Sequence, residues 1–280
     1  MSLVARFQTV VSGLSAVLFP SDCRLCSTPL IAVSRLPVCS ECLNSLEPVH
    51  APQCVLCGER LAPAQLLVGD AHCQACRDYP PEFERAVSYG EYSGALRELV
   101  HLLKYDGVLP AARPLGKLLA VAIEELCLGN ISVSDSLPIL VPVPLHGGKR
   151  RERRFNQEEL IAREARKYLP ANFDMDCAVL IRQRETRSQV GLDREARITN
   201  MRGAFRVAAA DRIQGRTIIV VDDVMTTGTT VSECARVLRG AGADRVFAAT
   251  VARTLKAAGT PGFHQQPEGE EIEAVQLASV

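Results

Sequence analysis

The sequence predicts an α/β protein in which a small cysteine-rich module precedes a doubly wound parallel sheet. Eight of the eleven cysteines fall between residues 23 and 76. After that module, short apolar runs alternate with amphipathic stretches, and this alternation is typical of a parallel sheet with helices on both faces. The run 217–230, TIIVVDDVMTTGTT, combines a buried strand, two acids and a hydroxyl-rich turn into a helix.

The eight clustered cysteines form four Cys-x2-Cys pairs, each of which can present two thiolates from one tight turn. Two pairs complete a tetrahedral zinc site with no open position, so we expect two structural zinc ions rather than catalytic ones. Successive sets of four are the preferred arrangement. Spacing leaves open an interleaved one, with the first pair joining the third and the second joining the fourth. The expected ligands are Cys23, Cys26, Cys39, Cys42, Cys54, Cys57, Cys73 and Cys76.

The length and net charge of the chain limit the number of domains and the kinds of partner that we expect. The 280 residues suffice for one sizeable domain plus a small one, and the formal net charge of zero gives no argument for nucleic acid as a partner. No apolar run approaches the roughly 18 residues of a membrane span, and the N-terminus lacks a clean signal-peptide cleavage site, so we expect a cytoplasmic protein. We expect a helical lead-in at 1–22, a double zinc ribbon at 23–78, the α/β domain at 79–255 and a disordered tail at 256–280.

Apolar periodicity gives the order of elements in the α/β domain. The expected strands are residues 85–92, 139–144, 178–181, 201–207, 217–222 and 245–252. The expected helices are residues 93–104, 114 to about 126, 155–168, and the hydroxyl-rich turn to about 240.

Two polar segments interrupt this order. Five of the six residues at 149–154 are basic, which suits either a solvated loop or a polyanion site. Residues 182–197 are long, polar and arginine-rich. They are expected to form a mobile loop that closes over a phosphorylated ligand, with a disordered surface loop as the alternative.

The acids and hydroxyls of the 217–230 run have a specific chemical use. Asp222 and Asp223 follow four aliphatic residues, so they lie at the carboxyl end of a buried strand, where open parallel sheets bind ligands. Carboxylates there can accept hydrogen bonds from vicinal sugar hydroxyls. The helix start at Thr226–Thr230 offers unpaired backbone N–H groups and hydroxyls to a phosphate. The pattern predicts a ribose 5-phosphate site, whereas simple helix capping would explain only one threonine and one acid.

Several further motifs occur in a fixed order after the four cysteine pairs. They are Lys104-Tyr105-x-Gly107, VPVPLH at 141–146, RRFNQEELIA at 153–162, RETRSQVGL at 184–192, NMRGAF at 200–205 and VVDDVMTTGTT at 220–230. Together they resemble the ComF family, also called the competence-protein F or GntX-like family, over about residues 19–253. One departure is Arg154, where that family commonly has glycine before Phe-Asn-Gln.

The resemblance implies a double zinc ribbon ahead of a type I phosphoribosyltransferase domain that binds phosphoribosyl pyrophosphate (PRPP) with Mg²⁺. By that resemblance, Asp222 and Asp223 contact the ribose hydroxyls, and Lys104 reaches the ligand from a hood. The 145–149 loop, with His146, Gly147 and Lys149, binds the pyrophosphate. The closing loop supplies the charge-stabilising residues Arg182, Arg184 and Arg187. The 5-phosphate is cradled by Thr226, Thr227, Gly228, Thr229 and Thr230.

The resemblance also implies a role in natural competence and the handling of incoming DNA. We therefore expect a pentosyl-transferring glycosyltransferase. The alternative is a non-catalytic protein that senses PRPP or binds nucleic acid. Under either hypothesis the expected partners are PRPP and single-stranded DNA or a DNA-uptake protein.

Overall fold

The computed structural model describes residues 21–30, 34–67, 71–130, 138–171, 173–186 and 194–255. Most of the expected lead-in at 1–22 and the expected tail at 256–280 lie outside the described residues. Within them, no helix is long and apolar enough to cross a lipid bilayer.

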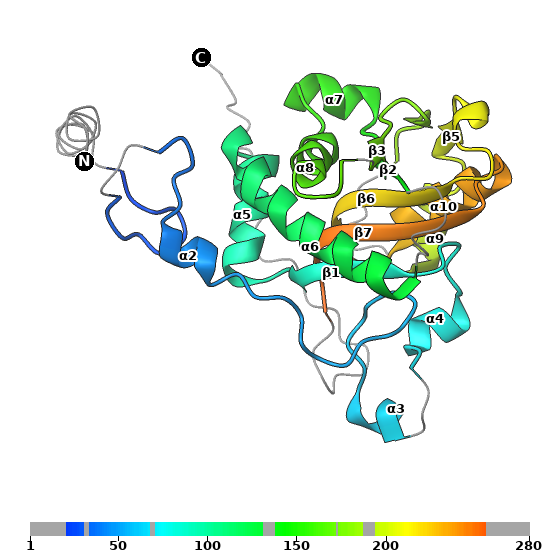
Figure 1. The fold of residues 1–280 in the computed structure, drawn as a ribbon, viewed down its shortest axis with the longest axis horizontal. Helices are drawn as coiled ribbons and strands as arrows, with labels where there is room; N and C mark the ends of the chain where they lie inside the picture. The colour runs from blue at the N-terminus through cyan, green and yellow to red at the C-terminus, as the bar shows by residue number, and fades with distance from the viewer. Residues whose placement is uncertain are drawn as a thin grey trace, which may run out of the picture.

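A five-stranded parallel sheet forms the centre of the α/β domain (Figure 1). Its spatial order is β1-β7-β6-β2-β3, and every neighbouring pair is parallel. The strands are β1 (Ala86–Glu91), β2 (Ile139–Pro142), β3 (Asp174–Met175), β6 (Thr217–Met225) and β7 (Arg245–Arg253).

Side chains of β6 alternate between two cores, because successive residues of a strand face opposite sides. Ile219 and Val221 join a cluster with helices α5 (Gly94–Lys104), α6 (Ala112–Asn130) and α8 (Gln157–Arg166). Ile218 and Val220 join a second cluster with α10 (Thr229–Gly240). Helices therefore cover both faces, as the sequence predicts.

The neighbouring strands β2 and β6 are followed by helices on opposite faces of the sheet. Helix α8 comes after β2 and packs in the first cluster, whereas α10 comes after β6 and packs in the second. Two adjacent parallel strands whose crossovers diverge in this way open a crevice at their carboxyl ends, which is where such sheets bind ligands.

The structure corrects three expectations about secondary structure. The runs at 178–181 and 201–207 do not join the main sheet. They supply β4 (Leu180–Arg182) and β5 (Phe205–Val207), a separate antiparallel pair. The end of the expected mobile loop at 182–197 belongs to a helix, α9 (Arg194–Met201), whereas its residues 187–193 lie outside the described residues. The basic stretch forms α7 (Gly147–Arg153) instead of a loop. The three-residue length of β4 and β5 explains the first error, since periodicity in so short a run does not distinguish one sheet from another.

The remaining described elements are short. They are α2 (Ser40–Asn44), α3 (Pro63–Leu67), α4 (Gln74–Asp78), η1 (Leu109–Ala111) and η2 (Ala210–Arg212). The cysteine-rich module occupies two separate regions beside the α/β domain (Figure 1). The first contains α2 and lies next to α5, and the second contains α3 and α4.

Candidate functional site

The eight cysteines of the N-terminal module gather into two groups of four. Within each group the sulfur atoms all lie within 4.8 Å of one another. Four thiolates at such mutual distances suit the closed, tetrahedral coordination of structural zinc, so the residues fit the metal. The groups combine successive pairs, which excludes the interleaved arrangement. The first group is Cys23, Cys26, Cys39 and Cys42, and the second is Cys54, Cys57, Cys73 and Cys76.

The second cysteine group is tied to the central sheet by an arginine. Arg253, the last residue of β7, donates from Nη2 to Cys57 Sγ at 3.6 Å and to Glu59 Oε2 at 3.1 Å. The Arg253 and Glu59 side chains are 4% and 10% exposed, so this is a buried ion pair. A zinc ion with four thiolates carries excess negative charge, and a neighbouring guanidinium offsets part of it.

At the carboxyl edge of the sheet, three acids converge. Carboxylate oxygens of Glu158, Asp222 and Asp223 lie within 4.8 Å of one another. Lys104, at the end of α5, pairs with Asp223 at 2.9 Å. The structure thus brings the expected Lys104, Asp222 and Asp223 together. It adds Glu158 from the first turn of α8, a residue for which the sequence predicts no role.

Burial and mutual repulsion perturb these groups. Burial first, and then the charge of Asp223, raises the pKa of Asp222 to about 7. Burial, followed by the charges of Asp223 and Asp222, raises the pKa of Glu158 well above its usual value. Burial alone would lower the pKa of Lys104, but the charges of Asp223 and Glu158 outweigh it and keep that pKa above the ordinary value. Asp222 and Glu158 therefore hold protons more readily than exposed carboxyl groups do.

The loop after β6 leads into a helix start at the position that the sequence predicts. Gly228 has φ +76° and directly precedes α10, leaving the first N–H groups of that helix free of intrahelical partners. The hydroxyls of Thr227 and Thr229 lie 2.8 Å apart. Arg197 of α9 donates to Thr226 Oγ1 at 3.1 Å, so a cation also reaches this loop. The sequence predicts a mobile loop at 182–197, whereas Arg197 lies in α9.

The loop after β2 runs beside the acids, because Val143 N donates to Val221 O at 2.8 Å. Its expected pyrophosphate-binding residues take part in the start of α7. His146 is the N-cap, accepting from Gly148 N at 3.4 Å, while Gly147 and Lys149 are exposed on the first turn. The helix ends at Arg153, and its C-cap is Arg154, whose φ of +64° lies in the left-handed region. Glycine adopts this conformation more readily, which explains the residue common at this position in the family.

The arginines expected in the closing loop differ in placement. Arg182 packs over the Phe205 ring, 5.5 Å from its centroid, and its charge acts on Asp222. The Arg184 guanidinium donates to the carbonyl oxygens of Asn200 and Arg202 at 2.6 and 2.9 Å, so it is engaged at the C-terminal end of α9. Arg187 lies outside the described residues.

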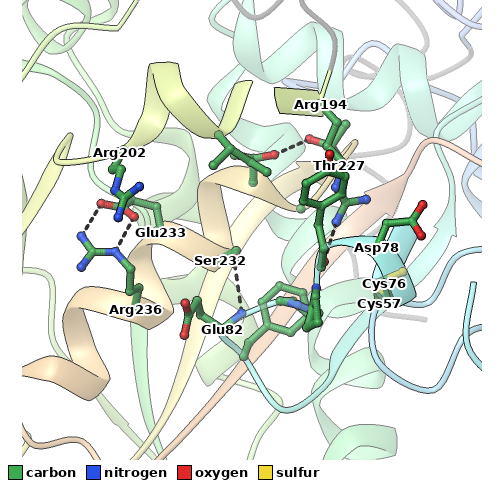
Figure 2. Close-up of a pocket in the computed structure, with 17 residues that line it drawn as sticks. Cys57, Cys76, Asp78, Glu82, Arg194, Arg202, Thr227, Ser232, Glu233 and Arg236 are labelled. Carbon is green, nitrogen blue, oxygen red and sulfur yellow. Dashed lines mark hydrogen bonds and ion pairs between the residues drawn. The ribbon is translucent and has the colours of Figure 1, made fainter. Parts of the chain in front are cut away.

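A cavity of about 340 Å³ separates the second cysteine group from the start of α10. Figure 2 shows Cys57 and Cys76 on one side of it and Ser232 and Glu233 on the other. Its lining also includes Thr227 and neighbouring residues of the hydroxyl-rich loop. The second cysteine group and the candidate phosphate cradle are therefore close neighbours in space.

Two family models match the chain and show the class of protein to which it belongs. A family model described as a phosphoribosyl transferase domain matches residues 170–265, and one described as a double zinc ribbon domain matches residues 14–77. With its parallel sheet, the protein has a type I phosphoribosyltransferase fold preceded by a double zinc ribbon.

Similarity to individual proteins shows the family to which the chain belongs within this class. DNA utilization protein YhgH of Salmonella typhimurium is 33% identical over 84% of this chain and 98% of its own length, and the Escherichia coli K12 protein of the same name is 32% identical over the same shares. Competence protein F of Haemophilus influenzae is 27% identical over 76% of this chain and 89% of its own length. The chain belongs to the ComF family, which confirms the resemblance carried by the motifs.

Proposed function

We propose that this protein binds PRPP with Mg²⁺ in the crevice between β2 and β6 and transfers the phosphoribosyl group to a nucleophilic acceptor. The observation that carries this proposal is the pairing of two ligand features at one sheet edge. Asp222 and Asp223 lie beside the N-terminus of α10, where Gly228 is the N-cap. Carboxylates that can accept hydrogen bonds from a diol are therefore next to backbone N–H groups that can donate to a phosphate.

The reaction would need little covalent chemistry from the protein. The acceptor attacks C1 of the ribose, the bond from C1 to the pyrophosphate oxygen breaks, and pyrophosphate leaves with the electron pair. The protein's task is to position the reactants and to neutralise charge as it develops. Lys104 and Arg182 lie near the acids for this purpose. Removing one well-placed donor of this kind costs about 2.7–4 kcal/mol of barrier in comparable sites.

We further propose that residues 23–78 act as the zinc-ribbon unit and residues 79–255 as the PRPP-binding unit. Mg²⁺ would supply charge neutralisation between the ribose hydroxyls and the pyrophosphate. The names of the relatives, DNA utilization protein and competence protein, support a role for this chain in DNA uptake or use.

A thermal-shift titration of the zinc-loaded protein with PRPP and Mg²⁺ tests the site. A ligand that binds only the folded state stabilises it by about 2.7 kcal/mol at a hundredfold excess over Kd. We expect this shift in the wild type and its loss in Asp222→Asn, whose side chain is nearly isosteric. Asp211→Asn, an exposed acid on η2, is the matched control and should keep the shift. A wild-type protein that shows no shift at millimolar PRPP would refute the proposal.

Single-stranded DNA binding is the second candidate, and the surface of α7 supports it. The side chains of Lys149, Arg150, Arg151 and Arg154 are all exposed along this short helix and its end. If they contact phosphates, affinity for single-stranded DNA should fall by roughly 0.7 log unit per log unit of salt for each contact. An Arg150→Ala/Arg151→Ala variant should reduce that slope, and Arg163→Ala on α8 should leave it unchanged. A slope near zero in the wild type excludes this candidate.

A further inference from the structure

The cavity beside the second cysteine group has no part in the proposed transfer reaction. Its lining does not include Lys104, Asp222 or Asp223, and it shares only residues 227–229 with the candidate phosphate cradle. Its volume of about 340 Å³ lies within the range of roughly 300–1,000 Å³ that is typical of small-molecule pockets. The cavity is therefore large enough for one small ligand besides the one proposed for the crevice.

One wall of this cavity is a face of α9 that carries two arginines. Arg194, Ile198 and Arg202 line the cavity, and residues four apart lie on one face of a helix. Arg202 follows the last residue of α9, but its N–H still donates to Ile198 O at 2.9 Å, so the helical path continues to it. At about 1.5 Å of rise per residue, the two arginines are about 12 Å apart along the helix. Figure 2 shows them at opposite ends of the cavity.

The end of the cavity near Arg194 offers an aromatic surface and an unused donor. The Arg194 guanidinium lies over the Tyr79 ring, 5.8 Å from its centroid, and Nη2 donates to Tyr79 O at 3.2 Å. The Nε atom of Arg194 is buried and has no acceptor among the residues that the structure describes. Pro80 and Phe83 add apolar surface. A flat heterocycle with a carbonyl oxygen or a ring nitrogen matches both features, because a buried donor is costly without an acceptor.

The end near Arg202 offers donors to an anion. Arg236 donates to both carboxylate oxygens of Glu233 at 2.7 Å, so that acid is already neutralised. The exposed Arg202 adds a further guanidinium beside this pair (Figure 2). Ser232 Oγ accepts from Glu82 N at 3.0 Å, which leaves the hydroxyl proton available to a ligand. The side chain of Glu82 is exposed, so water and salt screen its charge.

The charges around the cavity give it a direction. Cys57 and Cys76 line it, and Figure 2 shows them with Asp78 on the side away from Arg202. A zinc ion with four thiolates carries excess negative charge, and Asp78 adds a carboxylate. Repulsion therefore disfavours an anionic group at this side, whereas the N–H groups of a heterocycle can donate to Asp78.

We propose that this cavity binds a 5′-phosphorylated nucleotide, with the phosphate at Arg202 and the base at Arg194. The separation of the two arginines is comparable with the length of an extended mononucleotide. Two sources share this chemistry, a free nucleoside monophosphate and the phosphorylated 5′ end of a DNA strand. Because the acids of the crevice do not line the cavity, this is a second site, and binding there does not depend on the proposed transfer reaction.

Calorimetric titration of the zinc-loaded full chain with GMP and with CMP, without PRPP or Mg²⁺, tests the proposal. We expect one nucleotide to bind per chain. Arg202→Gln should weaken binding by about tenfold or more, because hydrogen bonds to charged groups contribute more than neutral ones. The matched control is Arg206→Gln, an exposed arginine of β5 that does not line the cavity and should bind as the wild type does. Asp222→Asn should also retain binding.

A second variant tests the cavity by volume instead of charge. Ile198→Trp places a large ring in the cavity and should abolish binding, while circular dichroism and zinc analysis check that the fold is intact. Absence of binding of either nucleotide at millimolar concentration would overturn the proposal. So would binding that Asp222→Asn removes and Arg202→Gln leaves intact, since the nucleotide would then lie in the crevice.

A short oligonucleotide distinguishes the two sources of the ligand. The probe is a pentadeoxynucleotide with a 5′-phosphate, compared with the same strand ending in a 5′-hydroxyl. Tighter binding of the phosphorylated strand than of the monophosphates, with the same loss in Arg202→Gln, assigns the site to strand ends. Binding of the monophosphates without binding of either strand assigns it to free nucleotides.

Discussion

The two zinc ribbons repeat one local design in different surroundings. In each, the turn that holds the first Cys-x2-Cys pair is closed by an isolated bridge, Asp22↔Pro29 in the first and Gln53↔Arg60 in the second. The surroundings differ in burial. All four cysteines of the second group are buried, whereas in the first group Cys26 is exposed and two others are partly exposed.

Their attachments to the α/β domain differ as well. The first ribbon packs Cys23 and Val38 into the cluster around α5 and α6, and adds an exposed ion pair from Arg24 to Asp106. The second ribbon hydrogen-bonds to β1 through Leu56 O, which accepts from Ala86 N at 2.7 Å, and its Cys57 contacts Arg253 of β7. The same arrangement of four cysteines thus lies in a peripheral module in the first ribbon and packs directly against the α/β domain in the second.

The largest difference should follow from removing one ligand of each site. Cys76→Ser should lose the second zinc and destabilise the whole α/β domain by several kcal/mol, because binding energy at a structural zinc is folding energy. Cys26→Ser should lose the first zinc yet leave the main thermal transition nearly in place. Zinc content by elemental analysis and melting by circular dichroism report the two effects separately. Equal losses of stability would show that both ribbons belong to one cooperative unit.

The next difference concerns the ion pairs. Arg253→Gln removes the buried ion pair with Glu59, and breaking such a pair typically costs 3–5 kcal/mol, about the range we expect here. Arg24→Gln removes an exposed pair and should change the unfolding free energy by less than about 1 kcal/mol. Urea denaturation of both variants measures the contrast. An Arg253 variant as stable as the Arg24 variant would mean that the second ribbon is not anchored through this contact.

Local sequence patterns predicted much of this architecture. Cysteine spacing predicted the eight cysteines that gather into two groups of four, and the apolar run with its acids located β6 and the start of α10. Each of these depends on neighbours within a few turns of chain. The strand proved longer than expected, since β6 extends through Asp222 and Asp223 to Met225.

Contacts between distant segments escaped prediction. Arg253 and Glu59 are separated by 194 residues, and no local periodicity relates them. Glu158 lies in the RRFNQEELIA motif at 153–162, but its approach to Asp222 depends on how α8 returns to the sheet edge. Its signal was present in part, because Asn156 as N-cap fixes Glu158 in the first helical turn after β2. Strand β3, which contains Met175, is also absent from the expected strands, because a strand of two residues is too short to show any periodicity.

The smallest predicted difference lies in the turns themselves. Ser27 and Gly58 follow Cys26 and Cys57 at matching positions, with φ of +59° and +70°. A non-glycine residue in this region carries strain of about 1–2 kcal/mol, partly offset by the lower chain entropy of an unfolded serine. Ser27→Gly should therefore stabilise the first ribbon by up to about 1 kcal/mol, and Gly58→Ala should destabilise the second by a similar amount.

The Ser27→Gly and Gly58→Ala variants should also change different measured quantities. Because the first ribbon is peripheral, Ser27→Gly should slow zinc loss to a chromogenic chelator while leaving the main melting temperature unchanged. Because the second ribbon is joined to β1 and β7, Gly58→Ala should lower that melting temperature. A Cβ at position 58 would meet only ordinary contacts, with Ala86 O at 3.5 Å, so backbone conformation and not crowding sets its effect. If both variants moved the melting temperature, the ribbons would be coupled alike to the α/β domain despite their unequal burial.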